Sequence, residues 1–333
     1  MPKELIMSNN IELLACGGYL PKKIVFNQDL ESSMATSDAW ITQMTGIKQR
    51  HMLSEDEDFL DCSYKAALAA LMEAKVSPQV VNLIIVATTT PFQLMPSTAA
   101  MLQQKLGIAN CVAFDMQAAC SGFIYALGTA NYLMEASSQF EYALVLGCDA
   151  FSNVIDHTDR TTGILFGDGF GAFLLKRSKN MSKKGIFYCR LGSDGQGIND
   201  LYIPWGIGQG IKAVAEKKPF ITMNGKQVFK HAVSRFTQEI KEALESTHLT
   251  VADVQHYIPH QANIRILQAV ATGLNIPMEK FIVSLDKHAN TSAASIPLAF
   301  NAAYQEGKIK RGDLVLLCGF GAGYTWGTTI FEF

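Results

Sequence analysis

Short apolar runs alternate along the chain with longer segments in which apolar positions follow a helical period. A short apolar run bounded by polar or turn residues is typical of a strand that is buried on both faces. We therefore predict strands over residues 83–87, 112–114, 142–146, 257–258, 281–283 and 314–317. Helical patterns lie between many of these runs, and this alternation indicates an α/β fold with mostly parallel sheets.

Two of the helical segments predict different environments. Phe236, Ile240 and Leu244 recur every four residues with charged residues on the opposite face, which predicts an amphipathic helix. Residues 122–134 are instead apolar nearly all round, which predicts a helix that is buried on every side.

The chain passes through one structural plan twice, although no literal sequence repeat is present. A predicted strand leads to a helix at Cys120 in the first half, and at His260 and Asn290 in the second half. Each half also contains a glycine-rich segment, Gly167–Gly171 and Gly319–Gly323 respectively. These parallels predict an internally duplicated fold.

The boundary between the halves is expected near residue 176, where a polar and basic stretch begins. This predicts an N-terminal unit of residues 1–175, which carries the cysteine, and a C-terminal unit of residues 176–333, which carries the histidine and asparagine. Residues 192–220 are rich in glycine and are expected to form a long loop, and long loops are often functional.

Composition and charge narrow the classes of function. The 333 residues are 48% apolar and 17% charged, which is enough apolar material for a large core or for two fused smaller ones. A formal net charge of -2 predicts no general attraction to nucleic acid or to a membrane surface. No apolar run approaches the roughly 18 to 20 residues that span a bilayer. The first residues lack the apolar segment of a signal peptide, so we expect a cytoplasmic protein.

Neither a disulfide framework nor a metal site is predicted. The seven cysteines are Cys16, Cys62, Cys111, Cys120, Cys148, Cys189 and Cys318. Their odd number and irregular spacing favour reduced thiols. His256 and His260 have the spacing of two ligands on one helix, but Pro259 between them and the strand-like residues before it argue against a helix there.

Cys120 is the first candidate for chemistry. It follows a predicted strand and two alanines and precedes a long helical pattern, so its sulfur is expected at or near a helix N-terminus. The backbone N–H groups at such a terminus favour the thiolate over the thiol. The small neighbours Ala118, Ala119 and Gly122 leave room for a bulky acyl group. A single free cysteine is, however, more often buried and inert.

His260 and Asn290 are each expected where a strand gives way to a helix. An imidazole at a helix N-terminus is disfavoured as the cation, so His260 is predicted to be neutral, with one N–H to donate. Taken alone, His260 is more often a structural histidine, and Asn290 is more often a helix N-cap.

The three residues suit one reaction when they are considered together. Ligand sites form beyond the carboxyl ends of parallel strands, so three such turns can meet in one crevice. A thiolate takes an acyl group from a thioester. If a second thioester carries a β-carboxylate, loss of CO₂ leaves an enolate, whose charge two N–H donors stabilise. The enolate then attacks the acyl group, and a backbone N–H of Gly319–Gly323, paired with that of Cys120, would hold the resulting oxyanion.

The sequence resembles the β-ketoacyl-acyl-carrier-protein synthase III family in several separate motifs, from about residue 10 to the end of the chain. They are Trp40-Ile41, Thr45–Ile47, Asp115–Phe123, Asp159-Arg160, Phe166–Gly169, Pro259–Asn263, Asn290–Ser295 and Gly321–Gly327. The resemblance implies a five-layered, internally duplicated thiolase-like α/β fold and a homodimer. It also implies a ping-pong reaction in which acyl-CoA acylates the cysteine and malonyl-acyl-carrier-protein then condenses with loss of CO₂, with no cofactor and no metal.

The same resemblance assigns roles to individual residues. Cys120, His260 and Asn290 match the catalytic residues, and the backbone of Ala322 matches the second oxyanion donor. The coenzyme A site matches Trp40 and Arg160, which would hold the adenine between them, and Gly225, Phe229 and Asn263, which would line the pantetheine tunnel. The acyl pocket matches Met95, at the place of an aromatic gate donated by the partner subunit, and Phe320. The carrier-protein contact matches Gln261, Ala262, Asn263, Ile264 and Arg265.

Three departures bear on the substrates. Met44 stands where the family often has a basic residue that contacts a coenzyme A phosphate. Thr272 stands in a helix that often carries lysines facing the acidic carrier protein. Met95 is more pliable than the aromatic gate, so the primer length is left open. A specialised relative of secondary metabolism, with another primer or acceptor, is therefore the main alternative.

Other functions fit the sequence less well. Papain-like proteases also use Cys, His and Asn, but their local signature around the cysteine is absent. The glycine-rich segments do not have the G-x-G-x-x-G spacing of a dinucleotide site, and residues 172–175 after the first of them are predicted to form a strand. A non-enzymatic carrier or scaffold would form no acyl-cysteine.

Overall fold

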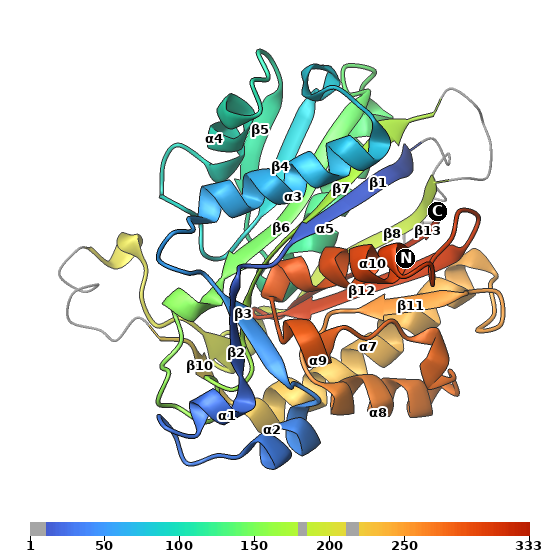
Figure 1. Ribbon diagram of the computed structural model, residues 1–333. Helices are drawn as coiled ribbons and strands as arrows, with labels where there is room; N and C mark the ends of the chain where they lie inside the picture. Colours follow the sequence, from blue (N-terminus) through green and yellow to red (C-terminus); the bar gives the residue numbers. More distant parts are fainter. Residues whose placement is uncertain (1–10, 179–184, 211–219) are drawn as a thin grey trace.

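The computed structural model describes residues 11–178, 185–210 and 220–333 of the chain. The remaining parts of the predicted N-terminal unit, of the stretch after residue 176 and of the segment 192–220 lie outside the described residues. Helices and two large sheets are stacked in layers (Figure 1).

The first large sheet has five strands in the order β1-β7-β6-β4-β5. They are β1 (Ile11–Tyr19), β4 (Leu83–Ala87), β5 (Val112–Met116), β6 (Tyr142–Ala150) and β7 (Asp168–Arg177). β4 pairs in parallel with β5 and with β6, whereas β7 is antiparallel to both β6 and β1. The strands predicted over 83–87, 112–114, 142–146 and 172–175 are therefore confirmed.

The second sheet has four strands in the order β11-β12-β13-β8. They are β8 (Gly185–Ser193), β11 (His256–Pro259), β12 (Leu314–Gly321) and β13 (Thr325–Glu332). β11 and β12 are parallel, and the other two pairings are antiparallel. The strands predicted over 257–258 and 314–317 are confirmed.

The strand predicted over 281–283 is wrong. Phe281 forms one isolated parallel bridge with Tyr257, and the chain then turns into helix α9 (Leu285–His288). The side chain of Gln261 explains why the pairing stops. Its amide group donates to the carbonyl of Ile282 and accepts the N–H of Ser284, so a side chain satisfies backbone groups that a longer strand would have paired.

The two sheets follow the same plan, as the internal duplication predicts. Read from β1 or from β8, the pairings are antiparallel, antiparallel and parallel, and the next parallel neighbour is β5 in one sheet and the Phe281 bridge in the other. All strands of the first sheet lie within residues 11–177 and those of the second within residues 185–332. The unit boundaries at residues 175 and 176 stay a prediction.

Helices form three layers around the two sheets (Figure 1). α3 (Phe59–Ala74) and α4 (Thr98–Lys105) cover the outer face of the first sheet. α5 (Gly122–Ala136) and α10 (Ser295–Gln305) lie between the sheets, and α7 (Gly225–Thr247) and α8 (Ile264–Leu274) cover the second sheet. This is the expected five-layered thiolase-like arrangement.

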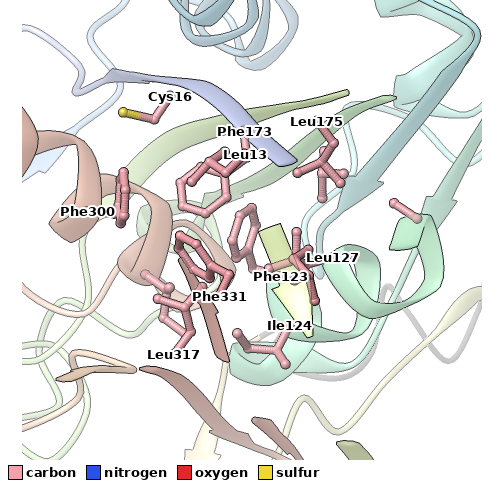
Figure 2. Close-up of a cluster of buried hydrophobic side chains, with 14 of the residues drawn as sticks. Leu13, Cys16, Phe123, Ile124, Leu127, Phe173, Leu175, Phe300, Leu317 and Phe331 are labelled. Atoms are coloured by element: carbon pink, nitrogen blue, oxygen red, sulfur yellow. The ribbon is translucent and has the colours of Figure 1, made fainter. Parts of the chain in front are cut away.

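The central layer explains the sequence patterns of its helices. Figure 2 shows apolar side chains of α5 and α10 meeting those of both sheets, and the rings of Phe123 and Phe173 pack edge to face with centroids 4.9 Å apart. α5 is apolar nearly all round because it has a sheet on each side, although Tyr132 is partly exposed. α7, in contrast, buries Phe236 and Ile240 on one face, so its predicted amphipathic character is confirmed.

Smaller elements surround the ends of the sheets. They are β2 (Lys23–Phe26) paired with β3 (Gln49–Met52), α1 (Asn27–Leu30), α2 (Asp38–Thr45), and β9 (Leu201–Tyr202) paired with β10 (Thr222–Met223). The described part of segment 192–220 therefore contains a short strand, β9, and is not entirely loop. No helix in the described ranges is long and apolar enough to cross a membrane.

Candidate active site

Cys120 lies where the first sheet meets the central layer. β5 ends at Met116, a 3-10 turn spans Ala119–Ser121, and α5 begins at Gly122, so the predicted order of strand, cysteine and helix is confirmed. Ala119 has a φ of 46°, a left-handed conformation that side chains rarely adopt, and it turns the chain sharply just before the cysteine. The thiol-bearing residue is 5% exposed.

The glycine-rich turn packs directly on the backbone of Cys120. A Cβ atom on Gly321 would lie 2.7 Å from the backbone nitrogen of Cys120, so a larger residue does not fit. Ala322 follows immediately, and the side chain of Thr325 donates to its carbonyl oxygen. The turn thus lies beside the predicted oxyanion donor of Cys120, while the role of the Ala322 backbone stays a prediction.

The resting state of the thiol differs from the expectation. Burial raises the pKa of the Cys120 thiol to about 12, and the nearby charge of Asp149 raises it further, while hydrogen bonding from Ser292 opposes the rise. The Ser292 hydroxyl is 3.6 Å from the sulfur. Burial therefore outweighs the helix N-terminus, and Cys120 rests as a thiol at neutral pH.

His260 is held as a neutral donor. It follows the last residue of β11 and is 3% exposed, and burial lowers its pKa to about 3. The expected neutral state therefore comes from burial. α8 begins only at Ile264, later than the sequence pattern predicts, so a helix terminus is not its cause.

The hydroxyl of Ser295 sets the direction of the imidazole. Its oxygen is 2.6 Å from Nδ1 of His260 and also accepts the N–H of Gln261 at 3.4 Å. A hydroxyl oxygen has two lone pairs, so Nδ1 can either accept the Ser295 hydrogen or donate its own, and the donor role predicted for the imidazole requires that it accepts. In that tautomer the imidazole hydrogen is on Nε2, and Nε2 is a donor.

Asn290 is positioned in a different way from the prediction. It lies between α9 and a 3-10 turn at Ser292–Ala294 that leads into α10, and no strand precedes it directly. Its backbone forms a parallel bridge with Phe166. Its Oδ1 accepts the N–H of Ser292 at 2.9 Å. Thr291 is the N-cap of that turn and Ala294 is the N-cap of α10, so the N-cap alternative is wrong for Asn290, whose amide nitrogen remains a donor.

One cavity of about 240 Å³ brings the three residues together. Cys120, His260 and Asn290 all line it, together with Phe320 and Gly321. The predicted convergence of three distant chain segments is therefore seen, and the cavity holds one sulfur nucleophile and two neutral donors.

The predicted coenzyme A residues also line this cavity. They are Trp40, Arg160, Gly225, Phe229 and Asn263. The guanidinium carbon of Arg160 lies 4.7 Å from the ring centroid of Trp40. An adenine between them needs about 7 Å, twice the contact distance of about 3.5 Å. In this conformation the two side chains stack on each other, so adenine binding between them requires Arg160 to move.

Asn263 and Met44 connect α8 with α2 at the rim of the cavity. The Asn263 side chain accepts the N–H of Arg265 and donates to the carbonyl of Met44 at 3.1 Å. Nη1 of Arg265 lies 3.9 Å from the sulfur of Met44. Arg265 therefore places an exposed cation next to the position where the family often has a basic residue.

Gln261 and Met95 do not lie where the predicted contacts require them. Gln261 is fully buried and bonds to Pro259, Ile282 and Ser284, so it does not fit the predicted contact with a carrier protein. Ala262, Asn263 and Ile264 are partly exposed and Arg265 is exposed. Met95 is 82% exposed and is not among the described residues that line the cavity.

Three polar residues next to the site were not assigned roles from the sequence. Ser292 and Ser295 belong to the Asn290–Ser295 motif, and they contact Cys120 and His260 respectively. Asp149 is the last residue but one of the buried strand β6 and accepts several hydrogen bonds near Ser292. A charged residue at the end of an otherwise apolar run was the signal that could have identified Asp149.

Comparisons with known proteins agree with this geometry. The families described as "3-Oxoacyl-[acyl-carrier-protein (ACP)] synthase III" and its "C terminal" part match residues 114–195 and 244–333. A β-ketoacyl-[acyl-carrier-protein] synthase III of Wolbachia pipientis wMel is 47% identical over 98% of this chain and 100% of its own. The chain belongs to the β-ketoacyl-acyl-carrier-protein synthase III family.

Solved structures support the same assignment. The synthase III of Aquifex aeolicus VF5 matches with a TM-score of 0.90 and 41% identity, covering 97% of this chain and 100% of that one. The priming β-ketosynthase of the R1128 polyketide pathway has the same TM-score of 0.90 but 31% identity, covering 100% and 98%. As a member of this family, the chain is an acyltransferase that catalyses a condensation, and it has a thiolase-like fold.

Proposed function

We propose that this chain joins an acyl group from acyl-CoA to malonyl-acyl-carrier-protein with loss of CO₂, the condensation that initiates fatty-acid synthesis. The observation that carries the proposal is the single cavity in which Cys120 meets His260 and Asn290. The full-length similarity to synthase III relatives supports the same reaction.

The proposed reaction has two stages that share one cavity. Cys120 attacks the thioester of acyl-CoA, and coenzyme A leaves from an acyl-enzyme. The malonyl thioester then binds with its carbonyl oxygen at Nε2 of His260 and Nδ2 of Asn290. Loss of CO₂ gives an enolate, and the two preorganised donors stabilise the new negative charge. The enolate attacks the acyl group and expels the cysteine.

The buried state of the donors suits this role. A neutral imidazole with a lowered pKa remains a hydrogen-bond donor throughout the physiological pH range, and it takes no proton from the substrate. Ser295 and Ser292 hold the two donors in place before the substrate arrives. Such preorganisation lowers the barrier because no reorientation is needed when the charge develops.

Exposed cations near the cavity support a phosphate-bearing donor and an acidic carrier. Arg160 and Arg265 line the cavity and are exposed, and Lys226 and Lys230 are exposed on the first turns of α7. Cationic side chains at a cleft attract anionic partners and speed their association. We therefore retain Arg265 as a carrier-protein contact, and Trp40 and Arg160 as coenzyme A contacts.

Mass spectrometry of the intact protein tests this proposal directly. The protein is incubated with an equimolar mixture of acetyl-, butyryl-, isobutyryl- and octanoyl-CoA, and peptide mapping identifies the loaded residue. We expect one acyl group on Cys120. Labelled malonyl-acyl-carrier-protein and malonyl-CoA are then supplied in parallel, and faster CO₂ release from the carrier-bound substrate is expected. An unloaded Cys120 with every donor would refute the proposal.

We also propose a homodimer in the cytoplasm. β5 is the last strand of the first sheet, and Val112 on it is 37% exposed. Phe92, Leu94 and Met95 are exposed by 45%, 71% and 82%, an unusual number of apolar side chains for a free surface loop. Light scattering during size-exclusion chromatography is expected to give twice the chain mass of 36.4 kDa. A measured mass equal to that of one chain would rule out the prediction that a partner subunit donates the gate residue of the acyl pocket.

The alternative function in secondary metabolism is not favoured. Identity to the priming ketosynthase of a polyketide pathway is 31%, compared with 47% and 41% for synthase III relatives.

A further inference from the structure

A carboxylate is buried beneath the site without a basic partner among its hydrogen bonds. Asp149 is fully buried at the end of β6. Its Oδ1 accepts the hydroxyl of Thr88 at 3.2 Å, the N–H of Thr89 at 2.7 Å, and the N–H and hydroxyl of Thr90 at 3.2 Å each. Its Oδ2 accepts the N–H of Ala293 at 3.2 Å. Oδ2 thus retains more capacity than Oδ1 to accept a further hydrogen.

Ser292 connects this carboxylate with the nucleophile. Its hydroxyl donates to the sulfur of Cys120 at 3.6 Å, and it is near enough to Asp149 to lower the pKa of that carboxyl against the effect of burial. Ser292 is fully buried and has a φ of 50°, a left-handed conformation that costs energy for any residue with a side chain. The surrounding structure therefore holds this hydroxyl between a sulfur and a carboxylate at the expense of backbone strain.

The hydrogen-bonding capacity of the three groups defines a direction. In the resting structure the single hydrogen of the Ser292 hydroxyl is directed to the sulfur of Cys120, and the ionised carboxylate of Asp149, an acceptor only, offers this hydrogen a second acceptor. When the hydroxyl turns to donate to Asp149, its oxygen becomes free to accept the S–H of Cys120. If the thiol loses its proton, the hydroxyl can turn and donate to the thiolate. The same atom thus serves the sulfur before and after ionisation.

His260 is poorly suited to take the proton of Cys120. Its Nδ1 is hydrogen-bonded to Ser295, and in the tautomer in which Nδ1 accepts this bond, Nε2 carries the hydrogen and has no lone pair to take a proton. Its lowered pKa shows that burial strongly disfavours the imidazolium. The Asp149 carboxyl has its pKa raised to about 6 by burial, so it is ionised at neutral pH and yet more basic than an ordinary aspartate.

We propose that Ser292 and Asp149 form the route by which Cys120 loses its proton when it is acylated. This inference rests on the proposed function. The S–H bond breaks and its proton passes to Oγ of Ser292, while the Ser292 proton passes to the Asp149 carboxylate. The sulfur electron pair forms the C–S bond of the acyl-enzyme, and coenzyme A leaves as a thiolate that takes a proton from water.

The route runs in reverse at the second stage. When the enolate attacks the acyl group, Cys120 is expelled as a thiolate. The proton held by Asp149 returns through Ser292 to the sulfur, and the enzyme regains its starting state. Ser292 touches the reacting sulfur and is a catalytic residue, whereas Asp149 acts through Ser292 and is a positioning residue.

The surroundings of Asp149 are compatible with this titration. Its titratable neighbours are Cys120 and the adjacent Cys148, and burial raises the pKa of both thiols, so both are uncharged at neutral pH. Asp115 on β5 also acts on Cys148, and its carboxylate is held by the N–H groups of Thr98 and Ala99. The residues of the β4 loop that face Asp149 are threonines, which carry no charge.

Alkylation of Cys120 by iodoacetamide tests the route without any acyl donor. The rate is followed by peptide mass spectrometry between pH 5 and pH 9 for the wild type and for Ser292→Ala. The wild-type rate is expected to fall as the pH drops through about 6, because protonation of Asp149 removes the acceptor. Ser292→Ala is expected to lose this step and to react more slowly at pH 7.

Ser121→Ala is the matched control. Ser121 is also fully buried, is the chain neighbour of Cys120, and bonds to Ala118 and Thr325 away from the sulfur. It is expected to keep the wild-type rate and pH profile. If Ser121→Ala and Ser292→Ala lose alkylation rate equally, the effect is one of packing and the proposal is refuted. A wild-type rate and pH profile in Ser292→Ala would also refute it. Asp149→Asn, checked for folding by circular dichroism, is expected to match Ser292→Ala.

Single-turnover acylation separates this inference from the proposed function. With the acyl-CoA that loads the wild type fastest, Ser292→Ala is expected to acylate on the order of 100-fold more slowly, the lower end of general base catalysis. If Ser292→Ala is acylated at the wild-type rate, the proton route is refuted and the proposed function is not. If the wild type is not acylated at all, but alkylation of Cys120 depends on Ser292, the proposed function is refuted and the proton route is not.

Discussion

The two helices of the central layer begin with the same backbone device and carry different chemistry. A 3-10 turn precedes α5 at Ala119–Ser121 and precedes α10 at Ser292–Ala294. Each turn starts at a residue with positive φ, 46° at Ala119 and 50° at Ser292. The first turn presents a nucleophile, and the second presents a donor and a hydroxyl that faces the sulfur. The two helices thus begin in the same way, but Cys120 lies within its turn, whereas Asn290 lies two residues before the other turn.

The difference lies in what fixes each residue. Cys120 is fixed by its own turn and by the close packing of Gly321. Asn290 is instead tied to the first half of the chain through its bridge to Phe166. Cys120 is therefore held by its own turn and by packing against the second half, whereas Asn290 takes its backbone hydrogen-bond partners from the first half.

Removal of the nucleophile is expected to have the largest effect. Cys120→Ser should lower acyl transfer by at least about 10³-fold, because a buried hydroxyl is a far weaker nucleophile than a thiol. Intact-mass analysis after incubation with acyl-CoA should show no added acyl group. An oxygen ester on the introduced serine, formed at the wild-type rate, would contradict the assigned role.

Removal of either donor should separate the two stages. His260→Ala and Asn290→Ala are expected to keep Cys120 acylation and to slow CO₂ release by about 10²–10³-fold, the usual cost of losing an oxyanion donor. Labelled malonyl-acyl-carrier-protein measures the release, and intact mass measures the acylation. Wild-type CO₂ release in both variants would refute the assignment of these donors.

The contact between the glycine turn and Cys120 can be tested with one methyl group. Gly321→Ala places a Cβ 2.7 Å from the Cys120 nitrogen and is expected to destabilise the protein by about 1–3 kcal/mol and to impair acylation. Gly195→Ala is the control, because its added Cβ has no heavy atom within 4 Å. Thermal melts and acylation rates compare the two. Equal melting temperatures and equal rates would contradict the packing argument.

Removal of the Arg160 side chain, which stacks on Trp40, should have the smallest effect. Arg160→Ala is expected to weaken coenzyme A binding by about 1 kcal/mol, roughly fivefold, which is typical of a cation–π contact. Calorimetry measures the affinity, and tryptophan fluorescence should change in the wild type on addition of coenzyme A. An unchanged affinity would overturn the assignment of Arg160.

Much of the fold could be predicted because its central layers are strongly patterned. Apolar runs such as 83–87 and 142–146 lie in the first sheet, which is covered on both faces, so burial alone predicts a strand. The run 281–283 has a similar pattern, yet it fails to form a strand because the side chain of Gln261 takes its backbone partners. A competing contact between distant residues cannot be read from a local pattern.

The sequence predicts which residues form the site better than it predicts their states of ionisation. The motif residues Cys120, His260 and Asn290 do share a cavity. The thiolate expected at Cys120 is wrong because the depth of burial, which sequence does not give, outweighs the helix terminus. The positions of Asp149 and Ser292 depend on the same three-dimensional packing.

The bridge between Asn290 and Phe166 has a consequence for any attempt to divide the protein. Leu165 and Gly167 supply the backbone partners of Asn290, and both belong to the polypeptide before residue 176. A fragment that starts after that point carries the asparagine without its anchors. Two separately expressed fragments would therefore regain decarboxylation only when they reassociate, which makes CO₂ release a reporter of their reassembly.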